Sequence, residues 1–311
     1  MTDALTLHDL THRYGDRVAL RAVDASVPRC GLFALLGPNG SGKSTLFKIV
    51  STLVQPDLGQ VWVGGCDVRT RQRAVRRMIG VVFQNPSVDR HLTVRENMIH
   101  QGHLYGLRGQ ALHARIDELL DLFDLADRSS DRAATLSGGL RRRVEIAKSM
   151  LHAPEMLILD EPSTGLDPHA RDEMIRVLKT LRDRSGVTSL ITTHLMEEAD
   201  QCNLVGILSE GHLVALDAPD TLKSAVGGDV VTLTTSDAAA LATRITQQFE
   251  VPCAVSGSEI RIELEDGHRF VPRVLQAFPD AVDRISVGKA TLSDAYFHFT
   301  GKKLAPWEAP P

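Results

Sequence analysis

The pattern of apolar and polar positions predicts strands of two kinds. Residues 5–10 and 18–27 alternate between apolar and polar side chains, which is typical of half-exposed strands. Continuous apolar runs at 32–36, 79–83 and 156–159 are typical of strands buried on both faces of a parallel sheet. Shorter runs predict further strands at 60–63, 190–192, 204–208 and 213–216. We therefore expect an antiparallel part near the N-terminus and a buried, mostly parallel sheet.

Helical signals replace the strand signals over about residues 86–152, which predicts an all-helical insertion. Thr93 and Glu96 have the spacing of a capping box, and the helix that they begin runs to about Tyr105. An amphipathic helix is expected at 111–125, and another helix begins at Leu140. Further along, Asp167 and Pro168 start a helix, because aspartate is a good N-cap and proline suits the first turn.

The helix from Leu140 has two kinds of face. We expect a buried apolar stripe and a solvent-exposed polar face. The stripe consists of Leu140, Val144, Ala147 and Leu151, and the polar face of Arg141, Arg142, Glu145 and Lys148.

Gly227 and Gly228 mark a boundary, beyond which the element order is βαββαβ. This is the order of the split βαβ, ferredoxin-like fold. We expect strands and helices in turn at 229–235, 237–249, 251–255, 259–264, 268–277 and 282–288, followed by a short helix at about 291–300. The sequence thus predicts two domains, 1–225 and 229–311, with a frayed proline-rich end from Ala305.

Composition narrows the class of protein. The chain has 311 residues, of which 43% are hydrophobic and 24% charged, as in ordinary soluble proteins. Its net charge of −4 argues against a dominant nucleic-acid surface, so no nucleic-acid partner is expected. Its apolar runs are shorter than the roughly 20 residues that span a bilayer. The cysteines are scattered, which indicates reduced, cytosolic thiols.

Five arginines between residues 69 and 77 stand out against this acidic balance. A solvated helix face is the interpretation that we favour, and contact with an acidic partner or lipid head groups is the alternative.

Residues 37–45, Gly-Pro-Asn-Gly-Ser-Gly-Lys-Ser-Thr, lie between an apolar strand and a helix, which is the context of a phosphate-binding P-loop. Glycines at three positions let the backbone N–H groups face an anion, and the positive end of the helix points at the same place. Lys43 supplies a charge for the outer phosphates, and Ser44 supplies a hydroxyl for Mg²⁺, with Thr45 beside it. The sequence therefore predicts binding of a nucleoside triphosphate with Mg²⁺.

Polar residues follow several of the buried strands, where ligands bind in open α/β sheets. Asp160 is placed to hold Mg²⁺, and Glu161 is placed to polarise an attacking water. His194 follows the strand at 190–192, where a γ-phosphate is expected, and Gln84 is expected to contact Mg²⁺ or the water. These positions predict hydrolysis in addition to binding.

Two further features are ambiguous when taken alone. Ser137, Gly138 and Gly139 precede a helix, so they form either a second anion site or a plain N-cap. The acidic residues that follow soon afterwards favour the anion site. Tyr14 lies in the first hairpin, where it is either a base-stacking residue or an ordinary turn tyrosine.

Together these motifs resemble the ATP-binding subunits of ABC transporters over residues 1–225. The resemblance implies a P-loop NTPase (RecA-like) core with an N-terminal antiparallel part, an inserted helical subdomain and a small C-terminal α+β domain. It implies that Gly37, Pro38, Asn39, Gly40, Ser41, Gly42, Lys43, Ser44 and Thr45 form Walker A, and that residues 136–140 form the signature.

The resemblance also implies roles for single residues. Tyr14 stacks on adenine, Gln84 belongs to the Q-loop, and Asp160 is the Walker B acid. Glu161 is the general base, Asp167 belongs to the D-loop and His194 is the switch histidine.

One departure points to a branch of the family. Leu140 replaces the glutamine common in the signature, and three arginines follow it. This variation and the motif at 292–301 are similar to the daunorubicin-resistance type of ABC-2 exporter. The branch implies a head-to-tail homodimer that binds ATP between its subunits, with a separate membrane permease. It places the chain on the cytoplasmic face of the cell membrane.

Two alternatives have weaker support. A soluble ABC ATPase acting on ribosomes or DNA normally has two cassettes or long coiled coils, and this chain has one cassette without sustained heptads. A GTPase requires an Asn-Lys-x-Asp stretch, which the sequence lacks.

Overall fold

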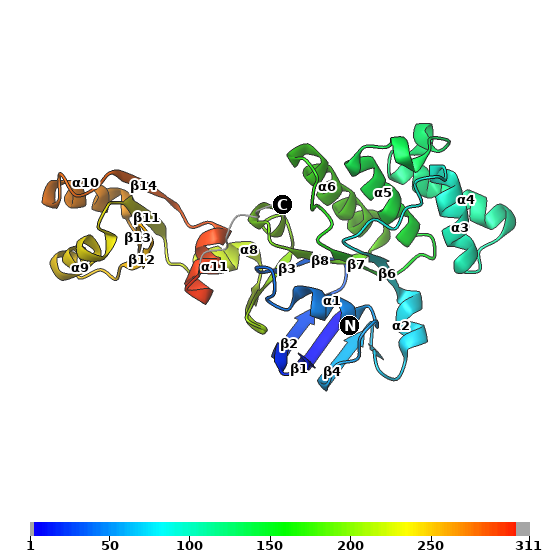
Figure 1. Cartoon of the computed structure of the whole chain (residues 1–311), viewed down its shortest axis with the longest axis horizontal. Helices are drawn as coiled ribbons and strands as arrows, with labels where there is room; N and C mark the ends of the chain where they lie inside the picture. Colours follow the sequence, from blue (N-terminus) through cyan, green and yellow to red (C-terminus); the bar gives the residue numbers. More distant parts are fainter. Residues whose placement is uncertain (1–2, 303–311) are drawn as a thin grey trace. The chain divides into compact units, whose positions relative to one another are not determined.

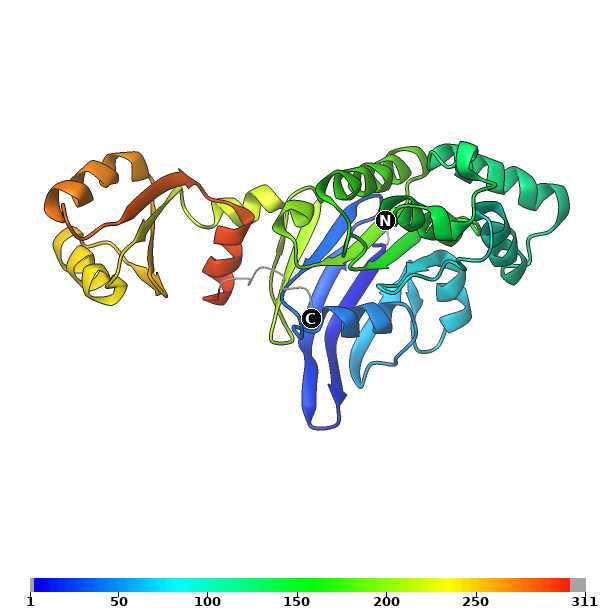
Figure 2. The same cartoon turned by 45° about the horizontal axis from the view of Figure 1, so that its top comes forward.

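The computed structural model describes residues 3–302, which divide into two compact units between Ala218 and Pro219 (Figures 1 and 2). The proline-rich end from Ala305 lies outside the described residues. The domain limits 1–225 and 229–311 stay a prediction, and each unit is described below by itself.

A six-stranded sheet forms the centre of the first unit, in the order β10-β9-β3-β8-β7-β6. Its strands are β3 (Leu32–Leu36), β6 (Ile79–Val82), β7 (Met156–Asp160), β8 (Thr188–Thr193), β9 (Leu204–Ser209) and β10 (His212–Asp217). All neighbours pair in parallel except β9 and β10, which are antiparallel. Every residue of β3 and β7 is buried, as the continuous apolar runs predicted. The carboxyl ends of five strands therefore share one edge.

A second, antiparallel sheet has the order β2-β1-β4-β5. Its strands are β1 (Leu5–Tyr14), β2 (Arg17–Val27), β4 (Leu58–Val63) and β5 (Cys66–Asp67). Helix α1 (Lys43–Val50) lies between the two sheets in Figure 1 and buries Leu46, Phe47 and Ile49 in their shared core. Because α1 follows the carboxyl end of β3 and packs in this core, its N-terminus lies at the carboxyl edge of the parallel sheet.

The described chain between β6 and β7 forms helices, which confirms the predicted helical insertion. They are α3 (Val94–Leu104), α4 (Gly109–Leu122), the short 3₁₀ turns Ala126–Arg128 and Ala133–Thr135, and α5 (Gly138–Ser149). The capping box of Thr93 and Glu96 is present at the start of α3. Figure 2 shows these helices grouped at one end of the first unit.

Three other helices complete the first unit: α2 (Gln72–Met78), α6 (Pro168–Ser185) and α7 (Met196–Ala199). Asp167 caps α6 as predicted, by accepting the backbone N–H of Ala170, and Gly186 ends this helix in the left-handed region. Around α2, Arg69 and Arg76 donate hydrogen bonds to Pro56 and Thr52 respectively. The arginines at 71, 73 and 77 are exposed, in agreement with a solvated face.

The second unit has the expected βαββαβ order, with an antiparallel sheet ordered β12-β13-β11-β14. Its elements are α8 (Pro219–Ser224), β11 (Asp229–Thr234), α9 (Ala238–Phe249), β12 (Ala254–Ser256), β13 (Glu259–Leu264), α10 (Gly267–Ala277), β14 (Arg284–Lys289) and α11 (Leu292–Thr300). Helices α9 and α10 share an apolar core with one face of the sheet. On the other face, Arg261 pairs with Asp294 of α11.

One prediction about α5 is wrong. Arg142, Glu145 and Lys148 were expected to face solvent, but each is less than 9% exposed. Helical periodicity assigns polar residues to the outer face because it takes no account of distant hydrogen-bond partners. Here backbone carbonyl groups from other segments meet this face of α5 and accept hydrogen bonds from Arg142 and Lys148.

Candidate active site

The loop 37–45 joins β3 to α1 and bends where its glycines permit. Gly40 and Gly42 have φ angles of 80° and 113°, in the left-handed region that favours glycine. A Cβ atom on Gly37 would lie 2.3 Å from the carbonyl oxygen of Leu208, so only glycine fits. Helix α1 has no side-chain cap at its N-terminus, so its first N–H groups are left for a ligand.

Beside this loop lies a cavity of about 340 Å³. It is lined by residues of the antiparallel sheet, of the P-loop and α1, and by the residue that follows β7: Tyr14, Arg17, Ala19, Asn39, Gly40, Gly42, Lys43, Ser44, Thr45 and Glu161. The Tyr14 ring is 47% exposed and packs edge-to-face on His12, with 4.7 Å between ring centroids. An aromatic face, an ammonium group and a hydroxyl therefore line one hollow.

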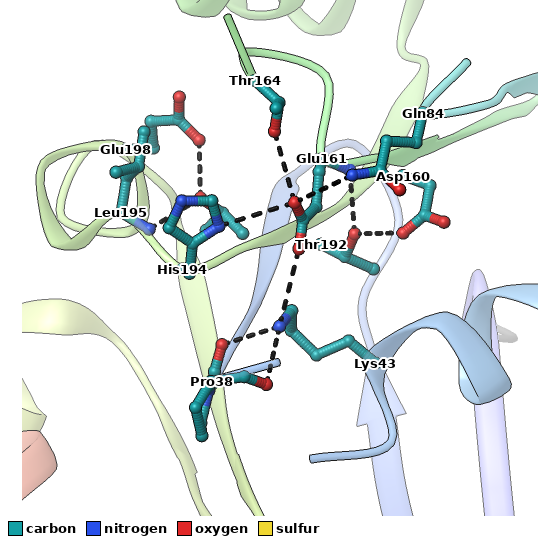
Figure 3. Close-up of polar contacts among 12 residues, drawn as sticks. Pro38, Lys43, Gln84, Asp160, Glu161, Thr164, Thr192, His194, Leu195 and Glu198 are labelled. Carbon is teal, nitrogen blue, oxygen red and sulfur yellow. Dashed lines mark hydrogen bonds and ion pairs between the residues drawn. The ribbon is translucent and has the colours of Figure 1, made fainter. Parts of the chain in front are cut away.

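Asp160 and Glu161 lie at the tip of β7, as expected, and both are buried. The Thr192 hydroxyl on the neighbouring strand β8 donates to Asp160 Oδ1 at 2.6 Å. The same hydroxyl oxygen accepts the backbone N–H of Glu161 at 2.9 Å (Figure 3). Parallel pairing of β7 with β8 places Asp160 opposite Thr192, so the sheet register sets this contact.

The Glu161 carboxylate is the centre of a polar cluster (Figure 3). His194 Nδ1 lies 3.5 Å and Gln84 Nε2 3.4 Å from its Oε2. Thr164 donates to the same oxygen at 3.2 Å, and Lys43 Nζ lies 3.7 Å from Oε1. Gln84, Glu161 and His194 come from three strand ends, so the topology brings together residues far apart in sequence.

Lys43 also binds its own loop. Its ammonium group donates to the carbonyl oxygens of Gly37 at 2.7 Å and Pro38 at 3.0 Å. These bonds hold the side chain across the loop, with the charge beside Glu161.

The pKa values of Asp160 and Glu161 are shifted in opposite directions. The adjacent His194 ring, whose Nδ1 lies 3.5 Å from the carboxylate, lowers the pKa of Glu161, and the charge of Lys43 acts in the same direction. Burial raises the pKa of Asp160 and lowers that of Lys43. Glu161 therefore stays an ionised carboxylate at neutral pH, which is the form that accepts a proton from water.

This set of groups fits a nucleoside triphosphate with Mg²⁺. The buried Ser41 hydroxyl has no hydrogen-bond partner among residues 3–302, so the loop holds an unused polar group. The free N–H groups of α1 and the Lys43 ammonium suit phosphate oxygens. The Ser44 hydroxyl and the Asp160 carboxylate are oxygen ligands of the kind that Mg²⁺ prefers.

The second group of predicted residues lies outside this cavity. Ser137 caps α5 by accepting the N–H of Leu140, and Gly138 lines a separate cavity of about 180 Å³. Neither these residues, Gly139 nor Asp167 is among those that line the P-loop cavity. Gln84 lines the second cavity and also contacts Glu161, so it lies next to both groups.

Sequence reasoning missed two residues of the Glu161 cluster. Thr192 was assigned only to a strand, although a polar residue at the end of a buried strand is itself a signal. Thr164 follows Glu161 by three residues, and local spacing predicts a contact across such a turn.

Comparison with known proteins agrees with the fold and the motifs. The family model described as ABC transporter matches residues 20–164. The chain is 36% identical to the daunorubicin resistance ATP-binding protein DrrA3 of Streptomyces coeruleorubidus, over 96% of each chain. It is 35% identical to the Nod factor export ATP-binding protein I of Burkholderia orbicola, over 96% of this chain and 98% of the relative.

Among solved structures, the chain is similar to the dimeric bacterial ABC transporter cassette MJ0796. The TM-score is 0.61 at 26% identity, over 69% of this chain and 98% of that one. The fold and these matches define a P-loop ATPase of the ATP-binding cassette class. The chain belongs to the family of ABC transporter ATP-binding proteins, and it resembles the daunorubicin-resistance branch.

Proposed function

We propose that this chain is the ATP-hydrolysing subunit of an ABC-2-type membrane exporter and works with a separate permease. Relatives named for drug resistance and for Nod factor export match it over 96% of its length. This similarity includes the second unit as well as the ATPase core. We propose that the exported molecule is drug-, lipid- or polysaccharide-like.

The geometry around Glu161 is the observation that carries the catalytic part of the proposal. Backbone N–H groups of the P-loop and Lys43 bind the phosphates of ATP, and Tyr14 stacks on adenine. Ser44 and Asp160, together with Gln84, hold Mg²⁺. When bound, the ion neutralises charge on the phosphate oxygens.

Glu161 orients and deprotonates the attacking water, because its carboxylate is ionised and lies beside Lys43. His194 holds that carboxylate in place and faces the expected position of the γ-phosphate. Gln84, which follows the third strand end, contacts the same carboxylate. This contact links the site of the attacking water to the loop that contains Gln84.

The signature residues Ser137, Gly138 and Gly139, with Asp167, act on the ATP of a second copy. Their absence from the lining of the P-loop cavity supports this assignment, because they do not contribute to the ATP site of their own chain. The similarity to a dimeric cassette supports it independently. Two head-to-tail subunits then enclose two equivalent ATP sites.

The proposed localisation of the chain follows from its proposed permease partner. As an exporter subunit, the chain binds the cytoplasmic face of the cell membrane through its permease. None of the helices within residues 3–302 is both long enough and apolar enough to cross a membrane.

The test is purification of the full chain from its native membranes. We expect an integral membrane protein to co-purify, and we expect Glu161→Gln to abolish export while the complex still forms. The alternative is a soluble ABC ATPase that acts on ribosomes or DNA. Co-sedimentation with ribosomes or DNA, without any membrane protein, would favour that alternative.

A further inference from the structure

Arg142 in α5 points inward, where its guanidinium group meets the backbone of two other segments. Its side chain is 8% exposed. Nε donates to the carbonyl oxygen of Pro162 at 2.7 Å, and Nη1 donates to that of Phe83 at 2.7 Å. Nη2 lies 3.4 Å from the carbonyl oxygen of Asp160. One side chain therefore holds the ends of both β6 and β7.

These carbonyl groups flank the reacting groups of the site. Phe83 immediately precedes Gln84, while Asp160 and Pro162 lie on either side of Glu161. Gln84 and Glu161 are within 3.4 Å of each other. A displacement of the guanidinium group would therefore move the backbone next to both residues.

Glu145 and Lys148 extend the same set of contacts along α5. Glu145 Oε2 accepts from Arg142 at 2.6 Å, and its Oε1 accepts the backbone N–H of Ser87 at 2.6 Å. Lys148 Nζ donates to the carbonyl oxygen of Ser87 at 2.9 Å. The three side chains thus fix the segment from Phe83 to Ser87 against α5, the helix that the signature residue Ser137 caps.

A core ion pair is a poor way to gain stability, because desolvation of both charges offsets their attraction. Apolar side chains of similar volume would serve packing at least as well. The planar, forked guanidinium group of arginine differs from apolar side chains because its N–H groups donate hydrogen bonds in several fixed directions at once. Here those directions match carbonyl groups from two strand ends.

We propose that Arg142 is a positioning residue for ATP hydrolysis, which fixes Gln84 and Glu161 relative to the signature helix. The proposal rests on the role proposed for Glu161. Lysine at position 142 would keep the charge and lose the fork. We therefore expect Arg142→Lys to misplace the two residues while leaving the P-loop cavity intact.

The experiment measures ATP hydrolysis by the full-length chain, per molecule competent to bind ATP. In Arg142→Lys we expect kcat to fall roughly 10- to 100-fold, with KM for ATP changed by less than about twofold. Arg115→Lys is the matched control, because Arg115 bridges Glu118 and the carbonyl oxygen of Met150 within the helical segment. It should lower the melting temperature and leave kcat unchanged.

A double variant separates positioning from packing. In Arg142→Met with Glu145→Leu, both members of the ion pair are removed while Lys148 keeps its hydrogen bond to Ser87, so the melting temperature should return towards wild type. Turnover should stay low, because the fork is still absent. Recovery of turnover along with stability would overturn the proposal, as would an unchanged kcat in Arg142→Lys.

Glu161→Gln is measured in parallel, so that the two proposals fail separately. If it hydrolyses ATP normally, the catalytic role of Glu161 is wrong. If it is inactive while Arg142→Lys is fully active, only the role of Arg142 is wrong.

Discussion

Thr192 donates a hydrogen bond to Asp160 Oδ1 at 2.6 Å across the parallel pair β7 and β8. The same oxygen accepts the N–H of Glu161, whose φ angle of 42° lies in the left-handed region. One hydroxyl therefore orients the proposed Mg²⁺ ligand and stabilises the bend that turns Glu161 towards Lys43. This contact makes the strand register part of the catalytic geometry.

Replacement of Thr192 by valine should affect both activity and stability. Valine keeps the shape but leaves the N–H of Glu161 buried without its acceptor, which costs about 1–3 kcal/mol. The Asp160 carboxylate also loses its fixed orientation, so hydrolysis should require more Mg²⁺ and have a lower kcat. Thr192→Ser retains the hydroxyl and serves as the control. An unchanged Mg²⁺ titration in Thr192→Val would contradict the role of this contact.

Two glycines should differ in their tolerance of alanine. At Gly37, a Cβ would meet the Leu208 carbonyl oxygen at 2.3 Å and Ser41 Oγ at 2.7 Å, so the loop must move. Overpacking of this kind costs about 1–3 kcal/mol, and ATP affinity should fall about 10-fold or more. At Gly138, the nearest atom would be a methyl carbon of Leu166 at 3.5 Å, which is an ordinary contact. Gly138→Ala should fold and bind ATP at the P-loop of its own chain with normal affinity, and calorimetry measures both affinities.

The proposed head-to-tail dimer predicts that two inactive variants restore activity when mixed. Lys43→Ala removes the P-loop charge, and Gly138→Asp puts a carboxylate where the signature would meet phosphate. In a mixed dimer both defects fall in one site, so the other site is intact. Half of randomly formed dimers are mixed, so the mixture should reach about a quarter of the wild-type rate.

Mixing two samples of Lys43→Ala serves as the control for that experiment. No recovery in the mixture of the two variants, with both proteins folded, would show that each subunit completes its own site.

Features with local causes were predictable from sequence. The Thr93–Glu96 capping box and the Asp167 N-cap depend on residues three positions apart, and both are present. The P-loop was also predictable, because its strand, loop and helix are consecutive in the sequence. The strand ends could also be placed, since parallel strands align their carboxyl ends at one edge.

Features with distant causes were not predictable. Arg142 was assigned to solvent because its acceptors, the carbonyl groups of Phe83 and Pro162, are far away in sequence. Thr192 contributes through strand register, which depends on the whole sheet. In both cases the decisive partner is a backbone atom or a residue of a neighbouring strand, so the local pattern does not identify that partner.

In the second unit, Asp229 should make stability depend on pH. It accepts Lys289 Nζ at 2.7 Å and the N–H of Gly267 at 3.0 Å, so it joins β11, α10 and β14. The hydrogen bond from Lys289 lowers the pKa of Asp229 below its ordinary value of 3.8. As the pH falls, the Asp229 carboxyl is protonated in the unfolded chain at a higher pH than in the folded chain. The stabilisation is therefore fully present above pH 3.8 and is lost as the pH falls through the folded pKa.

Asp229→Asn should therefore destabilise the second unit fully at pH 6 and by less at pH 3, which lies below the unfolded pKa of 3.8. Hydrogen exchange of β11 and β14 in the full chain, compared with wild type at each pH, measures this difference locally. Asp280→Asn is the matched control, because Asp280 is exposed and should give no difference at either pH. A constant difference between Asp229→Asn and wild type across this range would mean that the charge of Asp229 contributes nothing and that only its shape matters.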